Sequence, residues 1–262
     1  YAYLNVFLLA CFNSCNFDDA ILLRFLKILD KYLFAVEFFT AELIDESEIK
    51  TLDFSDTIIK LSSGNMVIKG VIEKLEKLYN FMITSEELRQ RSISYYHHNG
   101  FYHISWLRYF LCEYEFDLMK KSKCNIIKLD RCIYYEKGYN SIEHILPENS
   151  HYQYWLKLYK EFNSKQREKC KNSLGNFVAI SKEKNSKLGN LPFPEKKSNN
   201  QNTVGYKYGT YAEIELTQYD DWNAYDILNR GVKLITFLNE RWGIKIGSKK
   251  DKKYFLGLDF LD

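Results

Sequence analysis

The sequence lacks the features expected of a membrane-spanning or exported protein. It has no uninterrupted apolar segment of the roughly 20 residues that cross a bilayer as a helix. Its first residues, Tyr1 to Ala10, lack the charged start of a signal peptide. We therefore expect a cytoplasmic protein. The chain also lacks an initiator methionine, which predicts a fragment or a chain whose early part is not represented.

The cysteines form no C-x-x-C pair of the kind that binds structural zinc. They are Cys11, Cys15, Cys112, Cys124, Cys132 and Cys170. Their scattered positions in apolar surroundings favour buried, reduced thiols over a zinc knuckle or a disulfide framework. A second candidate metal group is the cluster of His97, His98 and His103, but aromatic residues surround it. Because such rings pack well, this pattern favours an aromatic-packed loop over a metal site.

The chain also has no recognisable reader of base edges. It contains no helix-turn-helix signature, no zinc-finger spacing and no aromatic pocket that can be assigned to a flipped base. Any affinity for nucleic acid is therefore expected to be mostly electrostatic. It should depend strongly on salt and weakly on base sequence.

What is present predicts an α+β fold that is mostly helical. The chain has 262 residues and is 46% apolar, which is enough for a sizeable core and two structural regions. Apolar residues recur at helical spacing in residues 18–39, 66–84, 85–94, 104–119 and 221–242. Asp18 or Asp19 is the expected N-cap of the first segment. The predicted regions are a helical bundle over residues 1–130, a second domain over residues 131–246 and a tail with a solvated lysine run over residues 247–262.

Three short stretches of the second region carry the polar residues of a candidate site. They are Ser141-Ile-Glu-His-Ile-Leu-Pro-Glu-Asn149, Leu174-Gly-Asn-Phe-Val-Ala-Ile180 and Lys184-Asn-Ser-Lys-Leu-Gly-Asn190. His144 follows a carboxylate, Asn176 opens an apolar run, and Asn185 comes nine residues later. Each residue alone is typical of a solvated loop or turn. Their order, spacing and strand-like flanks together predict one site, with a helix from about Tyr152 to Lys169 inserted between the first two stretches.

These residue types suit hydrolysis of a phosphodiester. Histidine titrates near neutrality, so His144 is the candidate general base. Mg²⁺ prefers hard oxygen ligands and keeps several waters, so Glu143 and Asn185 are the candidate metal ligands. In an extended segment, neighbouring side chains point to opposite faces, so Glu143 and His144 both face the phosphate only where the strand ends or bulges. Pro147 and the polar residues after it indicate that the strand ends nearby.

The same three stretches resemble the HNH, or ββα-metal, nuclease site. They are similar to the HNH domain at the C-terminal end of GmrSD-type modification-dependent restriction endonucleases, over about residues 139–197 and more weakly to residue 242. The resemblance implies that residues 131–246 form an HNH domain, and that the chain is a metal-dependent DNA endonuclease using one Mg²⁺ or Mn²⁺ ion. It also implies that Asn176 holds the loop that presents His144. Many HNH sites carry aspartate where this chain has Glu143, which leaves ligation by Glu143 less certain than by Asn185.

The resemblance further implies DNA as a partner and a role in antiviral defence against phage whose DNA is modified. In such enzymes the HNH region is coupled to an N-terminal NTP-sensing domain with a ParB-like fold, and no such domain is visible in this sequence. Basic residues crowd residues 157–171 and 182–197. The candidate phosphate contacts are Lys184, Lys187, Lys196 and Lys197. Such runs predict a phosphate-binding surface, or else a solvated helix face.

Two other functions remain open on sequence grounds. One is a catalytically degenerate HNH fold that binds nucleic acid or a protein partner. The other is an RNA-directed nuclease toxin. A metal-dependent nicking assay separates the enzyme from the binding module, and a comparison of RNA with DNA substrates separates the two nucleases.

Overall fold

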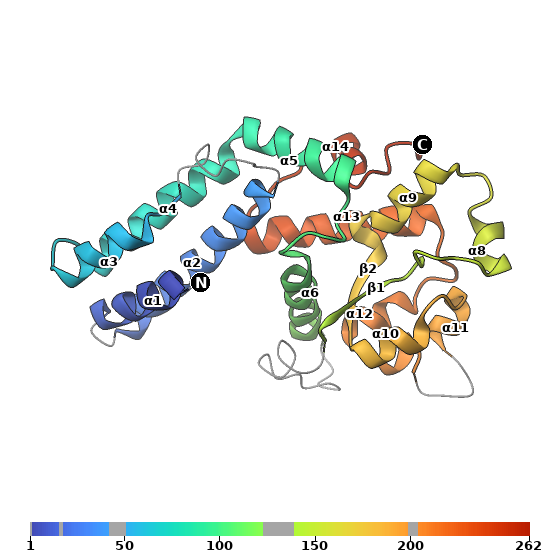
Figure 1. The fold of residues 1–262 in the computed structure, drawn as a ribbon, viewed down its shortest axis with the longest axis horizontal. Helices are drawn as coiled ribbons and strands as arrows, with labels where there is room; N and C mark the ends of the chain where they lie inside the picture. Colours follow the sequence, from blue (N-terminus) through green and yellow to red (C-terminus); the bar gives the residue numbers. More distant parts are fainter. Residues whose placement is uncertain (1, 16–17, 42–50, 123–138, 199–203) are drawn as a thin grey trace. The chain divides into compact units, whose positions relative to one another are not determined.

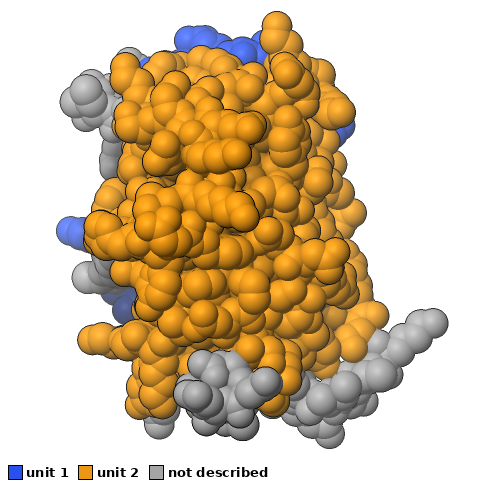
Figure 2. Space-filling model, turned by 90° about the vertical axis from the view of Figure 1, so that its right-hand side faces the viewer, with its two compact units in different colours: residues 1–92, 241–245 blue, residues 93–240, 246–262 orange. Residues whose placement is uncertain are grey.

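The structure is a computed structural model that describes residues 2–15, 18–41, 51–122, 139–198 and 204–262. The described chain is mostly helical and holds one small antiparallel sheet of two strands (Figure 1), as the predicted α+β class requires. Contacts divide the chain into two compact units, residues 1–92 with 241–245 and residues 93–240 with 246–262. Figure 2 colours the two units separately. The division falls within a helix and not at the predicted boundary near residue 130.

The first unit is a set of packed helices. They are α1 (Ala2–Ser14), α2 (Asp19–Thr40), α3 (Phe54–Ser62), α4 (Ile68–Thr84) and the first half of α5 (Glu86–Asn99). Helix α2 packs along α4, and α1 packs against α3. The predicted N-cap is confirmed, because the Asp18 side chain accepts hydrogen bonds from the backbone N–H groups of Ala20 and Ile21.

Residues 241–245 belong to this first unit because Trp242 is part of its core. The Trp242 ring stacks on Phe34 with centroids 3.8 Å apart. The Tyr79 hydroxyl donates to the Trp242 carbonyl oxygen at 2.7 Å. Trp242 is also the last residue of α13 (Ala224–Trp242), so the helix predicted over residues 221–242 is confirmed with a slightly later start.

The second unit contains the sheet and the helices around it. Its elements before the second strand are α6 (Leu107–Lys121), β1 (Ser141–His144), α8 (Gln153–Leu158), α9 (Ser164–Asn172) and the 3₁₀ turn η3 (Leu174–Asn176). Those that follow are β2 (Phe177–Ile180), α10 (Lys182–Leu188), α11 (Phe193–Lys197), η4 (Tyr206–Tyr208), α12 (Tyr211–Leu216), most of α13, and α14 (Lys249–Phe255). The single helix expected from Tyr152 to Lys169 is therefore two helices. The break is set by Asn163, which begins α9 with a capping box to Gln166.

The sheet is a short hairpin-like pair whose strands are distant in sequence. Strand β1 pairs antiparallel with β2, with Ser141 opposite Ile180 and His144 opposite Phe177. All four residues of β2 are buried. Helices α6 and α12 contact β2, and α10 contacts β1. Helix α10 begins directly after β2, because the Ser181 side chain accepts from the backbone N–H of Lys184 and caps the helix.

The segment 247–262, expected to be a tail, is packed. Its lysine run forms α14, which starts with a capping box between Ser248 and Asp251. Phe255 is fully buried and lies edge-on to Tyr96 and Phe101, with centroids 5.3 and 5.1 Å away. The lysine run thus forms a helix whose C-terminal end is anchored in the core of the second unit.

Four cysteines, Cys11, Cys15, Cys112 and Cys170, are buried free thiols, as predicted. Burial raises the pKa of the Cys11 and Cys170 thiols to about 12, which keeps them unreactive. Cys124 and Cys132 lie outside the described residues. None of the helices in the described ranges combines the length and apolar content of a membrane span.

Candidate functional site

His144 and Asn185 meet at one polar depression of about 210 Å³ at the end of β1. Its lining residues are Tyr102, Ile142, Glu143, His144, Pro147, Glu148, Asn149, Asn185, Gly189 and Asn190. Strand β1 supplies the histidine, the loop after it supplies one wall, and α10 supplies the asparagine. Asn176 does not line the depression.

His144 is the last residue of β1 and is held by two aromatic rings. Its centroid lies 4.3 Å from that of Tyr102 and 4.9 Å from that of Phe177. The side chain is largely buried, and its Nε2 atom has no hydrogen-bond partner among the described residues. Burial, followed by the charges of Lys196 and Lys171, lowers the pKa of His144 to about 4. The imidazole is therefore neutral near pH 7, which is the form a general base needs.

Asn176 is fully buried and clamps the loop that follows His144. Its amide nitrogen donates to the carbonyl oxygens of Leu146 at 3.0 Å and Lys171 at 2.9 Å. Its amide oxygen accepts from the Leu146 backbone N–H at 2.8 Å and from the indole N–H of Trp222 at 3.0 Å. The side chain has no group left for substrate, so these bonds are those of a residue that positions the loop.

Asn185 lies on α10 and faces β1. Its amide nitrogen donates to the Ser141 hydroxyl at 2.6 Å and to the Ile142 carbonyl oxygen at 3.1 Å. With the nitrogen fixed on the strand, the amide oxygen Oδ1 is the atom that remains for a ligand. This is the orientation that a cation ligand requires.

Glu143 and Lys196 do not occupy the positions expected of them. The Glu143 carboxylate is 2% exposed and accepts from Lys196 Nζ at 2.6 Å and from the Tyr206 hydroxyl at 3.1 Å. Lys196 itself is fully buried on α11. Burial raises the pKa of the Glu143 carboxyl and lowers the pKa of the Lys196 ammonium, and their pairing opposes both shifts. Lys196 cannot contact phosphate from this buried position, and the Glu143 carboxylate is engaged with Lys196 and Tyr206 and not free.

The other predicted phosphate contacts are mostly committed to the protein. Lys184 pairs with the buried Glu213. Lys197 donates to the carbonyl oxygens of Tyr219 at 2.7 Å and Asp220 at 3.2 Å. Lys187 is exposed. It follows Asn185 by two positions on α10, which turns its side chain about 200° around the helix axis, so it projects away from the face of Asn185. None of these three side chains is presented at the depression.

Lys171, by contrast, contacts Glu148, which lines the depression. Its Nζ donates to the carbonyl oxygen of Glu148 at 2.6 Å. It is near enough to His144 to contribute to lowering the pKa of the imidazole. Sequence reasoning placed Lys171 in a basic stretch but did not single it out, since nothing in the local pattern shows that the end of α9 reaches the loop after β1.

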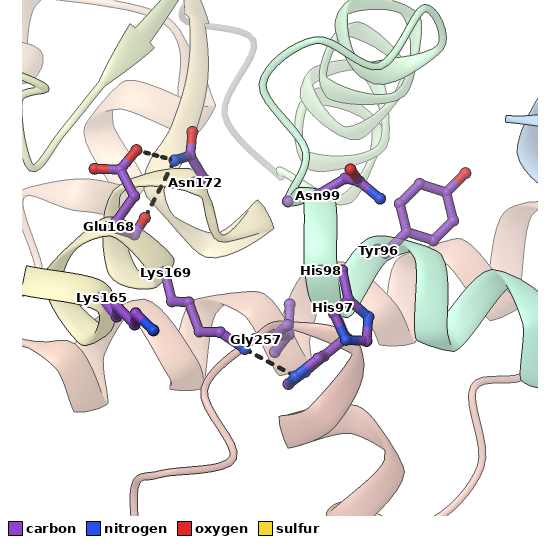
Figure 3. Close-up of a pocket in the computed structure, with 11 residues that line it drawn as sticks. Tyr96, His97, His98, Asn99, Lys165, Glu168, Lys169, Asn172 and Gly257 are labelled. Carbon is purple, nitrogen blue, oxygen red and sulfur yellow. Dashed lines mark hydrogen bonds between the residues drawn. The ribbon is translucent and has the colours of Figure 1, made fainter. Parts of the chain in front are cut away.

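Among the described residues, His97, His98 and His103 belong to no group of three or more side chains that could hold a metal ion. His97 and His98 lie on α5, not in a loop, and line a second cavity of about 240 Å³ (Figure 3). The His97 ring stacks on Tyr254 at 3.7 Å, with Nδ1 at 2.9 Å from the Tyr254 carbonyl oxygen and Nε2 at 2.8 Å from Lys169 Nζ. The predicted aromatic packing is confirmed. Burial lowers the pKa of His97, which keeps it a neutral acceptor for Lys169.

The donors around the depression fit a hard divalent cation only in part. Asn185 offers its amide oxygen, and Glu148 and Asn149 line the same space. Within the described ranges, no group of three or more His, Cys, Asp or Glu side chains is arranged to hold a metal ion. The chain would therefore supply few ligands, with water and a substrate phosphate supplying the rest. Glu148 and Asn149 were read from the sequence only as the end of the strand.

Comparison with known proteins gives one family. The family model described as GmrSD restriction endonucleases, C-terminal domain, matches residues 48–237. The match covers well over half of the chain and includes β1, β2 and α10. Searches of curated proteins and of solved structures gave no significant match.

Proposed function

Because the chain belongs to the family of GmrSD restriction endonuclease C-terminal domains, we propose that it is a metal-dependent DNA endonuclease of the HNH type. The family supports nuclease activity and DNA as the substrate. The HNH assignment and the metal dependence rest on the arrangement of the site. We extend the proposal to restriction of modified phage DNA in the cytoplasm, together with an NTP-sensing ParB-like domain of the same protein.

One observation carries the HNH assignment. Two antiparallel strands and the helix directly after the second strand bring His144 and Asn185 to one depression. Asn176, directly before the second strand, fixes the loop after the histidine. A ββα-metal site requires two strands followed by a helix, with the histidine at the end of the first strand and the asparagine on the helix, and this arrangement supports the proposal.

In this mechanism, His144 accepts a proton from the water that attacks the scissile phosphorus. The imidazole is neutral, and Tyr102 and Phe177 hold its plane. Burial makes it a weak base in the free protein, and the negative charge of an approaching phosphate would raise its pKa and strengthen it. Asn185 would hold the divalent cation through Oδ1. When bound, Mg²⁺ or Mn²⁺ supplies neutralisation of charge on the phosphate and the leaving oxygen.

The test is cleavage of supercoiled plasmid with Mg²⁺, with Mn²⁺ and with a chelator. The variant His144→Ala is compared with His98→Ala, which removes an exposed histidine away from the depression. We expect cleavage that needs the metal, a loss of about 10² to 10⁴ in rate for His144→Ala, and no loss for His98→Ala. Folding of each variant is checked by circular dichroism.

Three outcomes would contradict the proposal. Cleavage by folded His144→Ala at the wild-type rate would remove the general base. Binding of DNA without cleavage under any metal condition would favour the degenerate binding module. Cleavage of RNA with DNA left intact would favour the RNA-directed nuclease.

A further inference from the structure

The side chain of Lys196 reaches from α11 to three consecutive residues at the end of β1. Its Nζ lies 2.6 Å from Glu143 Oε1, 3.0 Å from the His144 carbonyl oxygen and 3.2 Å from the Ile145 carbonyl oxygen. An ammonium group has three protons, and these three acceptors match them. The lysine is fully buried, so its charge has no access to water.

Lys196 and Asn176 together hold the backbone on the C-terminal side of His144. Lys196 binds the carbonyl oxygens of His144 and Ile145. Asn176 binds the N–H groups of Ile145 and Leu146 and the carbonyl oxygen of Leu146. Both peptide groups between His144 and Leu146 are therefore held at two points, the carbonyl oxygen by Lys196 and the N–H by Asn176. The direction in which the His144 ring leaves the backbone is fixed by them.

Glu143 is the counter-ion of this arrangement. Its Oε1 accepts from both Lys196 and Tyr206, and Tyr206 is fully buried. Glu143 lines the depression together with His144, but its carboxylate faces Lys196 and Tyr206. To bind a cation, Glu143 would have to leave Lys196 as an uncompensated buried charge, which is strongly unfavourable.

We propose that Lys196 is a positioning residue for His144, and that Glu143 is its buried counter-ion and not a ligand of the catalytic cation. This inference rests on the proposed function, since it assigns roles around the proposed general base. It predicts that the carboxylate can be neutralised without loss of the cation, provided that the lysine is neutralised with it. The backbone hydrogen bonds of the lysine are then lost, and the histidine is misplaced.

The test uses the double variant Glu143→Gln/Lys196→Met, which removes both charges and avoids an unpaired buried ion. Mn²⁺ binding is measured by electron paramagnetic resonance, beside wild type and Asn185→Ala. We expect the double variant to bind Mn²⁺ as wild type does, and Asn185→Ala to bind it more weakly. In a single-turnover assay on bound DNA, the double variant should cleave about 10- to 100-fold more slowly because the base is misplaced. Loss of Mn²⁺ binding in the folded double variant would make Glu143 a ligand and overturn the inference.

A second measurement is independent of catalysis. The ring resonances of His144 are followed by nuclear magnetic resonance in Lys196→Met, in the double variant and in Lys184→Met. Lys184 belongs to another lysine–glutamate pair of the second unit, in which its ammonium pairs with the buried Glu213 on α12. The His144 signals should move in both Lys196 variants and stay in place in Lys184→Met. If they stay in place in all three, Lys196 does not position His144, whether or not the wild-type protein cleaves DNA.

Discussion

The two compact units of this chain bury different kinds of side chain. In the described part of the first unit, the buried polar residues are Thr57 and Ser92, and neither carries a charge. Among the described residues of the second unit, the buried charged ones are Glu113, Glu115, Glu143, Lys196, Glu213, Glu215 and Arg230. Apolar packing tolerates exchange of one apolar side chain for another of similar volume, whereas a buried charge requires its particular partner. The core of the second unit should therefore tolerate fewer substitutions, because its buried charges fix the geometry around the sheet.

The largest expected effect is a loss of stability when methionine replaces a buried charged residue of the second unit, compared with methionine at a buried apolar position of the first unit. Arg230 is fully buried and donates to the carbonyl oxygens of Gly175 and Phe177, each at 2.7 Å. Arg230→Met removes the donor to both carbonyls and the buried cation beside Glu215, which keeps Lys233 and the Tyr114 hydroxyl as partners. It should lower the free energy of unfolding by about 3 to 5 kcal/mol. Leu75→Met, at a fully buried position of the first unit, should lower it by less than about 1.5 kcal/mol.

Hydrogen exchange with mass spectrometry measures this difference, because peptides from each unit report its own opening. Faster exchange in Arg230→Met should be concentrated in peptides of β2 and the elements around it. Equal losses for the two substitutions would show that the buried charges of the second unit are no more demanding than apolar packing.

The same contrast explains which features the sequence could predict. Helix α2 follows from its apolar spacing and from Asp18 as its cap, because both signals are local. The Lys196 contacts do not follow, because whether a lysine is solvated or buried depends on partners about 50 residues away in sequence. The one local signal in the sequence was spacing: Lys196 follows the apolar Phe193 by three residues, and the structure buries both on α11. The sequence also indicated the packed end of α14, because the apolar residues Phe255, Leu256 and Leu258 follow the lysine run and are buried in the structure.

A second prediction concerns acid, because all five histidines lie in the second unit. The pKa of His144 falls from 6.5, the ordinary value of histidine and that of the unfolded chain, to about 4 in the folded protein. Between these values the unfolded chain binds the proton and the folded chain does not, so stability falls as pH falls through this window. The loss assigned to His144 between pH 7.5 and pH 5.0 is about 2 kcal/mol.

Urea unfolding of the second unit at the two pH values, in wild type and His144→Gln, measures this contribution. The pH dependence should be smaller in His144→Gln by about the amount given, whereas His98→Gln, at an exposed histidine, should retain it. Part of the dependence should persist in His144→Gln, because burial also lowers the pKa of His97. If His144→Gln kept the full pH dependence of wild type, burial of the His144 imidazole would not be the source of the loss of stability in acid.

The smallest expected effect concerns lysines that differ in place but not in charge. The Lys171 Nζ donates to the carbonyl oxygen of Glu148, a residue that lines the depression, whereas Lys69 is an exposed lysine of the first unit. If the second unit alone meets DNA phosphate, Lys171→Ala should reduce the slope of log affinity against log salt by about one unit. Lys69→Ala should leave that slope unchanged, and Lys187→Ala should also leave it unchanged because its helix face turns away from Asn185. Fluorescence anisotropy with a short duplex at several salt concentrations measures all three. An equal reduction by Lys69→Ala would extend the DNA contact to the first unit, and the contrast between the units would then hold for their cores but not for their surfaces.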